Sequence, residues 1–261
     1  METADSSSGS DHKGKFYFYW GYNGSAFTNS NIHFGGPDYD FTVQDVVAHD
    51  RPSPFSLSLY FNPATVSIPQ YNYRIGYFLT DRWSISIGLD HMKYVMDQNQ
   101  TALVTGTIDD EAGGIYAGIY DHTPVVLTED FLKFEHTDGL NLLSADAEYT
   151  ASLFTFLHDK ISLSVSSGIG FAATIPRTDV RVFGDGINNK FHLAGYGISA
   201  KSGARLEFFK NFFLLLQLRS GYINLPDILL NDNVPQRANQ HFFFLEYALT
   251  AGITFPFHKH S

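Results

Sequence analysis

Apolar residues alternate with small or polar residues along long segments of this chain. Such alternation places apolar side chains on one face of a strand and small or polar ones on the other. About eight segments reach the length of about 9 to 11 residues that a tilted membrane-spanning strand needs. They begin near residues 16, 70, 83, 140, 161, 192, 212 and 241. The pattern therefore predicts an all-β protein.

The connections between these segments alternate between short and long. Three short ones are predicted at Asp81-Arg82, Asp159-Lys160 and Lys210-Asn211. The long ones lie near residues 24–69, 96–139, 177–190 and 225–240. Short turns at one end and long loops at the other are typical of an up-and-down antiparallel transmembrane β-barrel with periplasmic turns and extracellular loops. We expect a single barrel of about eight strands over residues 16–257.

The composition of the two strand faces indicates which one meets lipid. The non-apolar face consists mostly of Ser, Gly and Thr, which are too small and too weakly charged for a solvated exterior but suit a crowded lumen. The apolar face would then point outward into the membrane. A soluble barrel of the lipocalin kind, with its apolar face around an internal ligand, is the alternative.

Composition and charge exclude several other classes. The chain has 261 residues, a net charge of -10, no Cys and 16% aromatic residues. An acidic chain without clustered Lys and Arg does not suit a nucleic-acid partner. No apolar run approaches the roughly 18 residues of a spanning helix. Residues 1–15 are polar and rich in Gly and Ser, and we expect a disordered leader there, the native export signal having been removed.

Aromatic residues and the last strand carry a resemblance to a known class. We expect an interfacial girdle near the tight turns and the C-terminus, formed by Tyr71, Tyr73, Trp83, Phe208, Phe212, Phe255 and Phe257. The final segment EYALTAGITFPF resembles the C-terminal aromatic signal of Gram-negative outer-membrane proteins, although four residues follow Phe257. The layout resembles the small eight-stranded barrels of that class. The resemblance implies integral outer-membrane localisation and contact with the outer-membrane assembly machinery.

Charges of both signs share the predicted lumen face. They are Arg74, Asp90, Asp146, Glu148, Lys201, Arg205, Glu207, Arg219 and Glu246. Isolated buried ions are costly, so these side chains should pair, and an eight-stranded barrel is narrow enough for side chains to fill. We predict a salt-bridged plug; a proton or ion path and a catalytic centre are the alternatives.

The second long connection is acidic. Asp109, Asp110 and Glu111 stand together, and five more acids between residues 121 and 138 accompany the single Lys133. Carboxylates at this density could hold Ca²⁺ or Mg²⁺, or bridge cations to lipopolysaccharide phosphates. Because no twelve-residue calcium-loop spacing is present, a solvated acidic loop is the simpler interpretation. No metal site is predicted from the histidines, and no other cofactor is expected.

A second, weaker resemblance concerns residues 133–139. Phe134, His136 and Asp138 are similar to the Phe-x-His-x-Ser motif of outer-membrane lipid A deacylases, with Asp138 in the position of the nucleophile. An aspartate cannot act as an activated hydroxyl. The resemblance implies His136 as general base and Thr137 or Ser144 as a replacement nucleophile. Glu148 would orient the histidine.

These observations predict a structural or recognition role through the extracellular loops, more in keeping with a binding protein than an enzyme. Alternation around residues 39–47 favours an extracellular hairpin, and long ordered loops on a rigid scaffold often carry recognition. Outer-membrane lipids, lipopolysaccharide and a protein at the loops are the expected partners, without nucleic acid. A lipid hydrolase is the first alternative, and a narrow channel or small hydrophobic-molecule transporter is the second.

Overall fold

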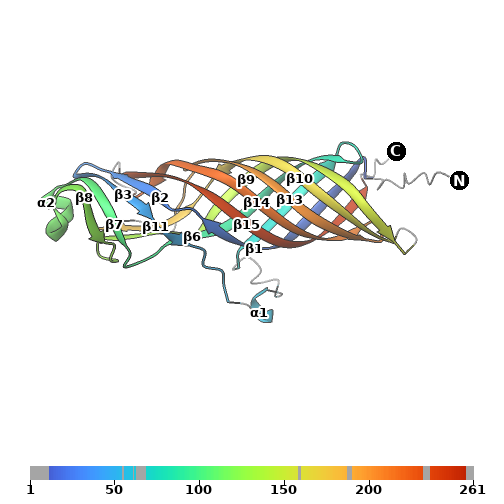
Figure 1. Cartoon of the computed structure of the whole chain (residues 1–261), viewed down its shortest axis with the longest axis horizontal. Helices are drawn as coiled ribbons and strands as arrows, with labels where there is room; N and C mark the ends of the chain where they lie inside the picture. Colours follow the sequence, from blue (N-terminus) through green and yellow to red (C-terminus); the bar gives the residue numbers. More distant parts are fainter. Residues whose placement is uncertain are drawn as a thin grey trace.

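Eight antiparallel strands close into a barrel in the computed structural model, which describes residues 12–54, 56–60, 62, 69–157, 160–186, 190–231 and 236–256 (Figure 1). Each strand pairs with its neighbour, and the last pairs back with the first. In barrel order the strands are β1 (Lys15–Phe27), β5 (Tyr71–Phe78), β6 (Trp83–Met96), β9 (Leu132–Phe156), β10 (Ile161–Thr174), β13 (Gly195–Phe208), β14 (Phe212–Leu229) and β15 (Arg237–Pro256). The predicted up-and-down barrel is confirmed.

Tight turns join the strands at one end of this barrel. In the last of them, Asn211 donates its backbone N–H to the Phe208 carbonyl, and Phe209 and Lys210 both have positive φ. Two positive φ values define the type I′ turn that suits the twist of a hairpin. The central residues are therefore Phe209-Lys210, one position earlier than predicted. Asp159 of another predicted turn lies outside the described residues.

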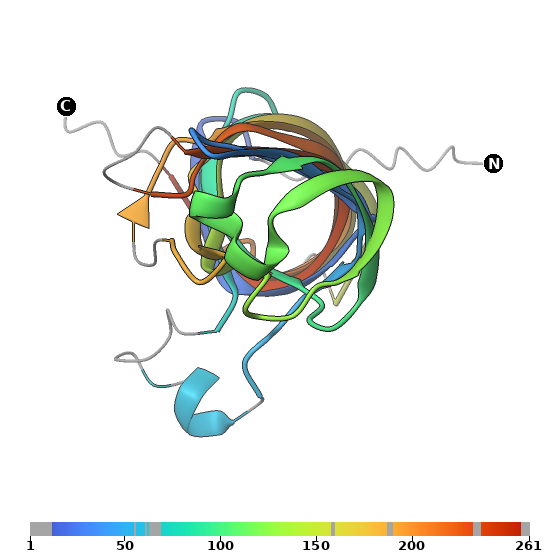
Figure 2. The same cartoon turned by 90° about the vertical axis from the view of Figure 1, so that its left-hand side faces the viewer.

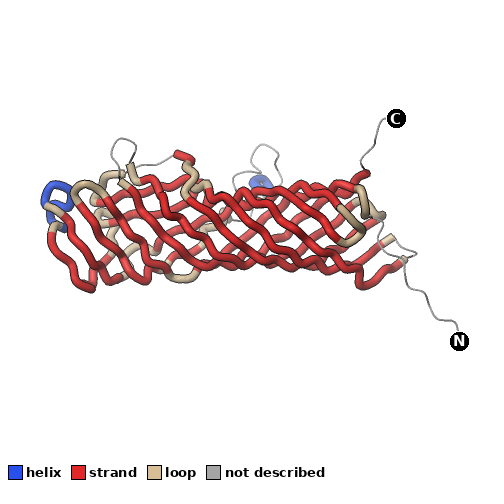
Figure 3. The backbone as a smooth tube through the Cα atoms, turned by 90° about the horizontal axis from the view of Figure 1, so that it is seen from above, coloured by secondary structure: helices blue, strands red, loops and turns tan. Residues whose placement is uncertain are grey.

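The opposite end continues into a second tier of sheet, which brings the strand count above the predicted eight. It contains β2 (Ser30–Gly35), β3 (Tyr39–Val46), β4 (Ala48–His49), β7 (Thr101–Ile108), β8 (Gly118–Val126), β11 (Arg177–Val182) and β12 (Lys190–Phe191). β2, β3, β7 and β8 follow β15 in order, while β4 pairs with β6 and β11 pairs with β9. Figure 3 shows strands along nearly the whole length of the molecule. We call this tier the extension.

Two short helices belong to the described parts of the long connections. The helix α1 (Leu57–Tyr60) lies beside the barrel wall, where the Tyr60 ring contacts Tyr22. The helix α2 (Asp110–Gly113) and a 3₁₀ turn at Gly114–Tyr116 join β7 to β8 at the far tip of the extension. Figure 2 looks onto this tip, with α2, β7 and β8 in green in front of the barrel ring. None of the helices in the described ranges is long and apolar enough to cross a membrane.

Apolar side chains point outward around the barrel, as predicted. Ile87 is 59% exposed on β6, whereas its neighbour Ser86 is buried in the lumen. The same alternation places exposed Ile, Leu, Phe and Tyr on all eight strands. An apolar exterior of this extent would be unfavourable in water, and it is the normal exterior of a transmembrane barrel.

Aromatic residues mark both edges of this apolar belt. Near the tight turns, Phe16 contacts Phe255 and Trp83 contacts Tyr149. The expectation that Tyr71 and Tyr73 belong to this girdle was wrong, because Tyr71 pairs with Tyr22 at the other end of the barrel and the Tyr73 ring stacks on Tyr71. Residue 71 begins a strand that follows a long connection, so it starts at the extracellular side. Phe257 lies outside the described residues.

The extension is built around an apolar core. Phe34, Phe41, Phe131 and Phe134 are fully buried in it, and the Phe34 ring stacks on Phe41 with 5.1 Å between centroids. Ala102, Val104 and Ile108 of β7 add an alternating buried face. The connections near residues 24–69 and 96–139 therefore contain a packed second tier where loops were expected.

The start of the chain also differs from expectation. Of the predicted disordered leader, residues 12–15 are described, and they pack against the barrel. His12 is buried, its ring stacks on Phe78, and its backbone N–H donates to Asp81. Lys15 opens β1. Residues 1–11 lie outside the described part of the chain.

Replacing Ile87 with Arg should destabilise the protein by about 2 to 4 kcal/mol, the cost of a cation on the lipid face near the membrane midplane. Leu103→Arg is the matched control. Leu103 is also an outward strand residue, 42% exposed, but it lies on β7 of the extension. It should cost about 0.5 kcal/mol or less. Urea unfolding in lipid vesicles, followed by gel mobility, measures both; equal costs would place the membrane boundary elsewhere.

Candidate functional site

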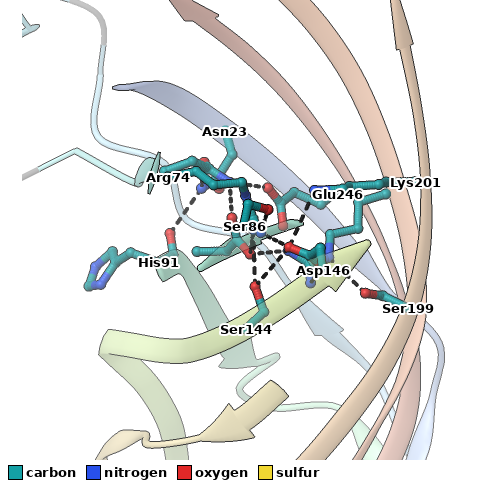
Figure 4. A network of polar contacts seen from close by, with 12 residues as sticks. Asn23, Arg74, Ser86, His91, Ser144, Asp146, Ser199, Lys201 and Glu246 are labelled. Atoms are coloured by element: carbon teal, nitrogen blue, oxygen red, sulfur yellow. Dashed lines mark hydrogen bonds and ion pairs between the residues drawn. The ribbon is translucent and has the colours of Figure 1, made fainter. Parts of the chain in front are cut away.

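A network of ion pairs occupies the middle of the lumen (Figure 4). Arg74 of β5 pairs with Asp90, at 3.2 Å, and with Asp146. Arg219 of β14 reaches the same two carboxylates. Four carboxyl and guanidinium groups from four strands thereby meet at one level of the barrel. All four residues are among the predicted lumen charges.

Lys201 and Glu148 extend this network toward the tight turns. The Lys201 Nζ lies 2.9 Å from Glu148 Oε1 and 3.3 Å from Asp146 Oδ2. The Tyr17 hydroxyl donates to Glu148 at 3.0 Å. On the opposite side of the network, Asn72 donates to Asp90 and to Glu246. Three cations therefore face four carboxyl groups, and the neutral donors Tyr17 and Asn72 add hydrogen bonds to three of these carboxyl groups.

Arg205 and Glu207 form a separate site nearer the periplasmic mouth. The Arg205 Nη2 lies 2.7 Å from Glu207 Oε2, and its guanidinium stacks on the Phe213 ring at 3.7 Å from the centroid. His12 contacts Glu207 through Nε2 at 3.2 Å. Tyr17, Tyr19, Phe78, Phe213 and Leu215 form a buried cluster at this level. The nine predicted lumen residues thus divide into two groups, with His12 as an additional member.

A third polar group lies above the central network, inside the extension. Tyr94, Ser30 and Gln240 share hydrogen bonds of 2.7 to 3.2 Å. The buried ring of His136 faces Tyr94 and accepts or donates a bond of 2.9 Å with Thr178. The apolar core of the extension covers this group. Filled layers therefore follow one another from the periplasmic mouth to the extracellular tip.

The four candidate hydrolase residues are all on β9 but lie in different surroundings. His136 is buried inside the extension, while Thr137 is half-buried and contacts Glu135. Ser144 and Glu148 belong to the central network, where Ser144 accepts from Arg74. Within the described ranges, no hydrogen bond joins His136 to the other three. The arrangement lacks the contact between base and nucleophile that acyl transfer needs.

The acidic residues Asp109, Asp110 and Glu111 lie exposed at the extension tip, around the start of α2. Among the residues that the structure describes, no group of three or more His, Asp or Glu is placed to hold a metal ion. Tyr39 lies buried beneath this region, and burial, with Asp185 and Asp38 nearby, raises the pKa of its hydroxyl to about 12. The tip is an acidic surface on an apolar base.

On the outer wall of the extension, a second ion-pair cluster joins β9 to β11. Lys133 lies 2.6 Å from Asp179 and 3.4 Å from Glu135. Arg181 and Arg51 complete the cluster through Asp179 and Glu135. These pairs fix β11 and the segment at Arg51 to the wall.

Comparisons with known proteins find distant matches among solved structures. No protein-family model and no curated protein matches the chain. Among solved structures, the outer membrane protein OprG from Pseudomonas aeruginosa is 9% identical with a TM-score of 0.41, covering 95% of this chain and 98% of that one. AlkL, an outer membrane protein, is 9% identical with a TM-score of 0.40, covering 100% and 99%. Neisserial surface protein A is 12% identical with a TM-score of 0.34, covering 93% and 97%.

The closed ring of eight strands, its apolar exterior and its two aromatic edges decide the class. The chain is an integral transmembrane β-barrel. The identities of 9 to 12% indicate nothing about a ligand or partner. The role of this barrel has to be inferred from its own residues.

Asp146→Asn should destabilise the barrel by about 3 to 5 kcal/mol, because the carboxylate faces Arg74, Lys201 and Arg219 and its loss leaves buried cations unpaired. Glu246→Gln should cost about 1 kcal/mol or less, since an amide oxygen can still accept from Asn72 and carboxyl groups outnumber cations. The temperature at which the folded gel band disappears ranks the two variants. The reverse order would mean that the network does not depend on Asp146.

Proposed function

We propose that this protein is a non-conducting outer-membrane barrel that holds an ordered recognition module outside the cell. The observation that carries this proposal is the continuity of the extension with the membrane barrel. β9 has 25 residues, whereas a membrane-spanning strand needs only about 9 to 11. The remaining residues form wall above the membrane, and β6 and β15 continue in the same way.

The filled interior supports the non-conducting part of the proposal. Arg74, Arg219, Tyr94 and Phe34 are among the largest fully buried side chains. The two arginines lie together in the central network, whereas Tyr94 and Phe34 belong to the core of the extension. An eight-stranded barrel has an interior that side chains can fill. Both a channel and a hydrophobic-molecule transporter would require this interior to rearrange.

The packing of the extension supports the recognition part. A purely structural membrane anchor needs no second tier of sheet beyond the lipid. Here β2, β3, β7 and β8 enclose an apolar core and place short connections on a rigid base. Binding residues are commonly carried by loops on a rigid scaffold, because the ordering cost of binding is then small.

In planar lipid bilayers, the purified barrel should show no steady ion conductance, because the lumen is filled by paired side chains. The double variant Arg74→Ser/Arg219→Ser removes two of the three central cations and should raise the conductance. A stable open channel in the unsubstituted protein would contradict the proposal.

Cells that display the protein should attach to one or more surfaces in a panel of heparin, collagen, fibronectin, laminin and a basic protein. Replacing residues 101–126 with a short Gly-Ser linker should abolish that attachment by removing β7, α2 and β8. Retention of the heat-dependent gel shift serves as the folding control. If the unsubstituted protein and the linker variant attach equally to every surface, the extension is not a recognition module.

A further inference from the structure

The charges of the extension are segregated. Residues 24–50 and 94–132 contain eleven Asp and Glu and neither Lys nor Arg. Eight of these acids are exposed: Asp40, Asp45, Asp109, Asp110, Glu111, Asp121, Glu129 and Asp130. The ion pairs found for this group in the described ranges are with histidines, as in Asp121 with His122. A surface of one sign without internal cations attracts a partner of the opposite sign.

The hairpin turns concentrate several of these acids at one place. The Asp109 N–H donates to the Asp38 carbonyl at 2.9 Å, which holds the β2–β3 turn against the β7–β8 turn. Asp40 pairs in register with Thr107 on the adjacent strand. Asp110 and Glu111 follow in the first turn of α2. The tip therefore presents carboxylates from two hairpins side by side.

An unpaired strand edge lies beside these carboxylates. β8 is the last strand of the sheet path, and its described pairing is with β7 alone. Ile119 of β8 is 87% exposed and Ile115 of the preceding 3₁₀ turn is 91% exposed, although both lie above the membrane belt. A free strand edge with exposed apolar residues is a template for another strand.

Only part of this edge is open to pairing. His122 has a positive φ, and its N–H is directed to Thr105. Pro124 has no N–H to give to an added strand. These features protect the half of β8 that is nearer the membrane. The open part is Gly118–Tyr120, next to the acidic turns. We call this segment, with Ile115 and the acids of the two hairpin turns, the acidic edge.

We propose that the acidic edge binds an extended, basic segment of a partner protein as an added β-strand. Its backbone would pair with Gly118–Tyr120, its apolar side chains would cover Ile115 and Ile119, and its Lys or Arg side chains would face the turn carboxylates. This inference rests on the proposed recognition function and names the partner's chemistry. A second copy of the chain is a poor occupant, because the same acids would meet one another.

The test uses the full protein in lipid nanodiscs and a short peptide of alternating Val and Lys as the probe. Fluorescence anisotropy should show binding that weakens at high salt. A peptide of alternating Val and Glu should not bind. The Val-Lys peptide with N-methyl groups on alternate amides keeps its charge but cannot pair along its backbone, and it should also fail to bind.

Two sets of variants locate the site. The triple variant Asp109→Asn/Asp110→Asn/Glu111→Gln should lower the affinity for the Val-Lys peptide by about tenfold, the combined effect of three exposed ion pairs. The double variant Ile115→Ser/Ile119→Ser should lower the affinity to a similar degree. Glu129→Gln/Asp130→Asn is the matched control, since these acids are exposed but follow the other end of β8. It should leave binding nearly unchanged.

Three results would overturn the inference: no binding of the Val-Lys peptide, equal binding of its N-methylated form, or equal losses in the control and tip variants. Failure of the recognition function itself has a different signature, because replacement of residues 101–126 would then leave cell attachment unaltered. A further result is also informative: cells could attach to heparin only when residues 101–126 are present, and still attach after the substitutions at Asp109, Asp110 and Glu111. That result would support the recognition function and exclude a basic partner.

Discussion

Charge pairing inside a narrow, closed lumen is the interaction on which the rest of this structure depends. With apolar side chains turned toward lipid, every charged residue on a spanning strand has to face inward. Burying a charge away from water is costly, and ion pairing offsets that cost. Asp146, for example, contacts Arg74, Lys201 and Arg219 from three other strands. Each such contact also ties two strands together across the barrel. The network therefore sets both the closure of the barrel and the filling of its lumen.

The same filling continues above and below the charges. Toward the periplasm, Arg205 stacks on Phe213, and His12 covers Glu207. Toward the outside, the apolar core of the extension includes Leu142, which pairs in register with Asp90 of the network. Because the layers are in contact, the extension is a continuation of the barrel interior. Its rigidity follows from packing, and this is what makes it suitable for presenting a surface.

The membrane part of this fold could be predicted from the sequence because alternation reports directly on the two faces of a strand. Ile85 and Ile87 alternate with Ser84 and Ser86, and serines are too small and too weakly charged for a solvated exterior, which favours the apolar face outward. The extension could be predicted only in part. Alternation around residues 39–47 indicated a hairpin, but Leu103 and Gly106 interrupt the alternation of Ala102, Val104 and Ile108, which are the buried face of β7.

The sites show the same division. The lumen charges were identifiable because each stands on the small-residue face of a strand. Their separation into a central network and an Arg205–Glu207 pair depends on strand register, which the sequence does not specify. His12 could not be found at all, since it lies in a polar segment with no periodic pattern. His136 resembled a catalytic residue in its motif, but the barrel places it inside a packed core.

Amide hydrogen exchange in lipid nanodiscs tests the central claim most directly. The claim is that the extension is packed continuously with the barrel. Buried amides of β2, β3 and β7 should then exchange as slowly as those of β14 and β15, because both sets open only with the common core. Exchange of the extension strands within seconds, beside a protected barrel, would mean that the segments outside the membrane are mobile loops and would contradict the account.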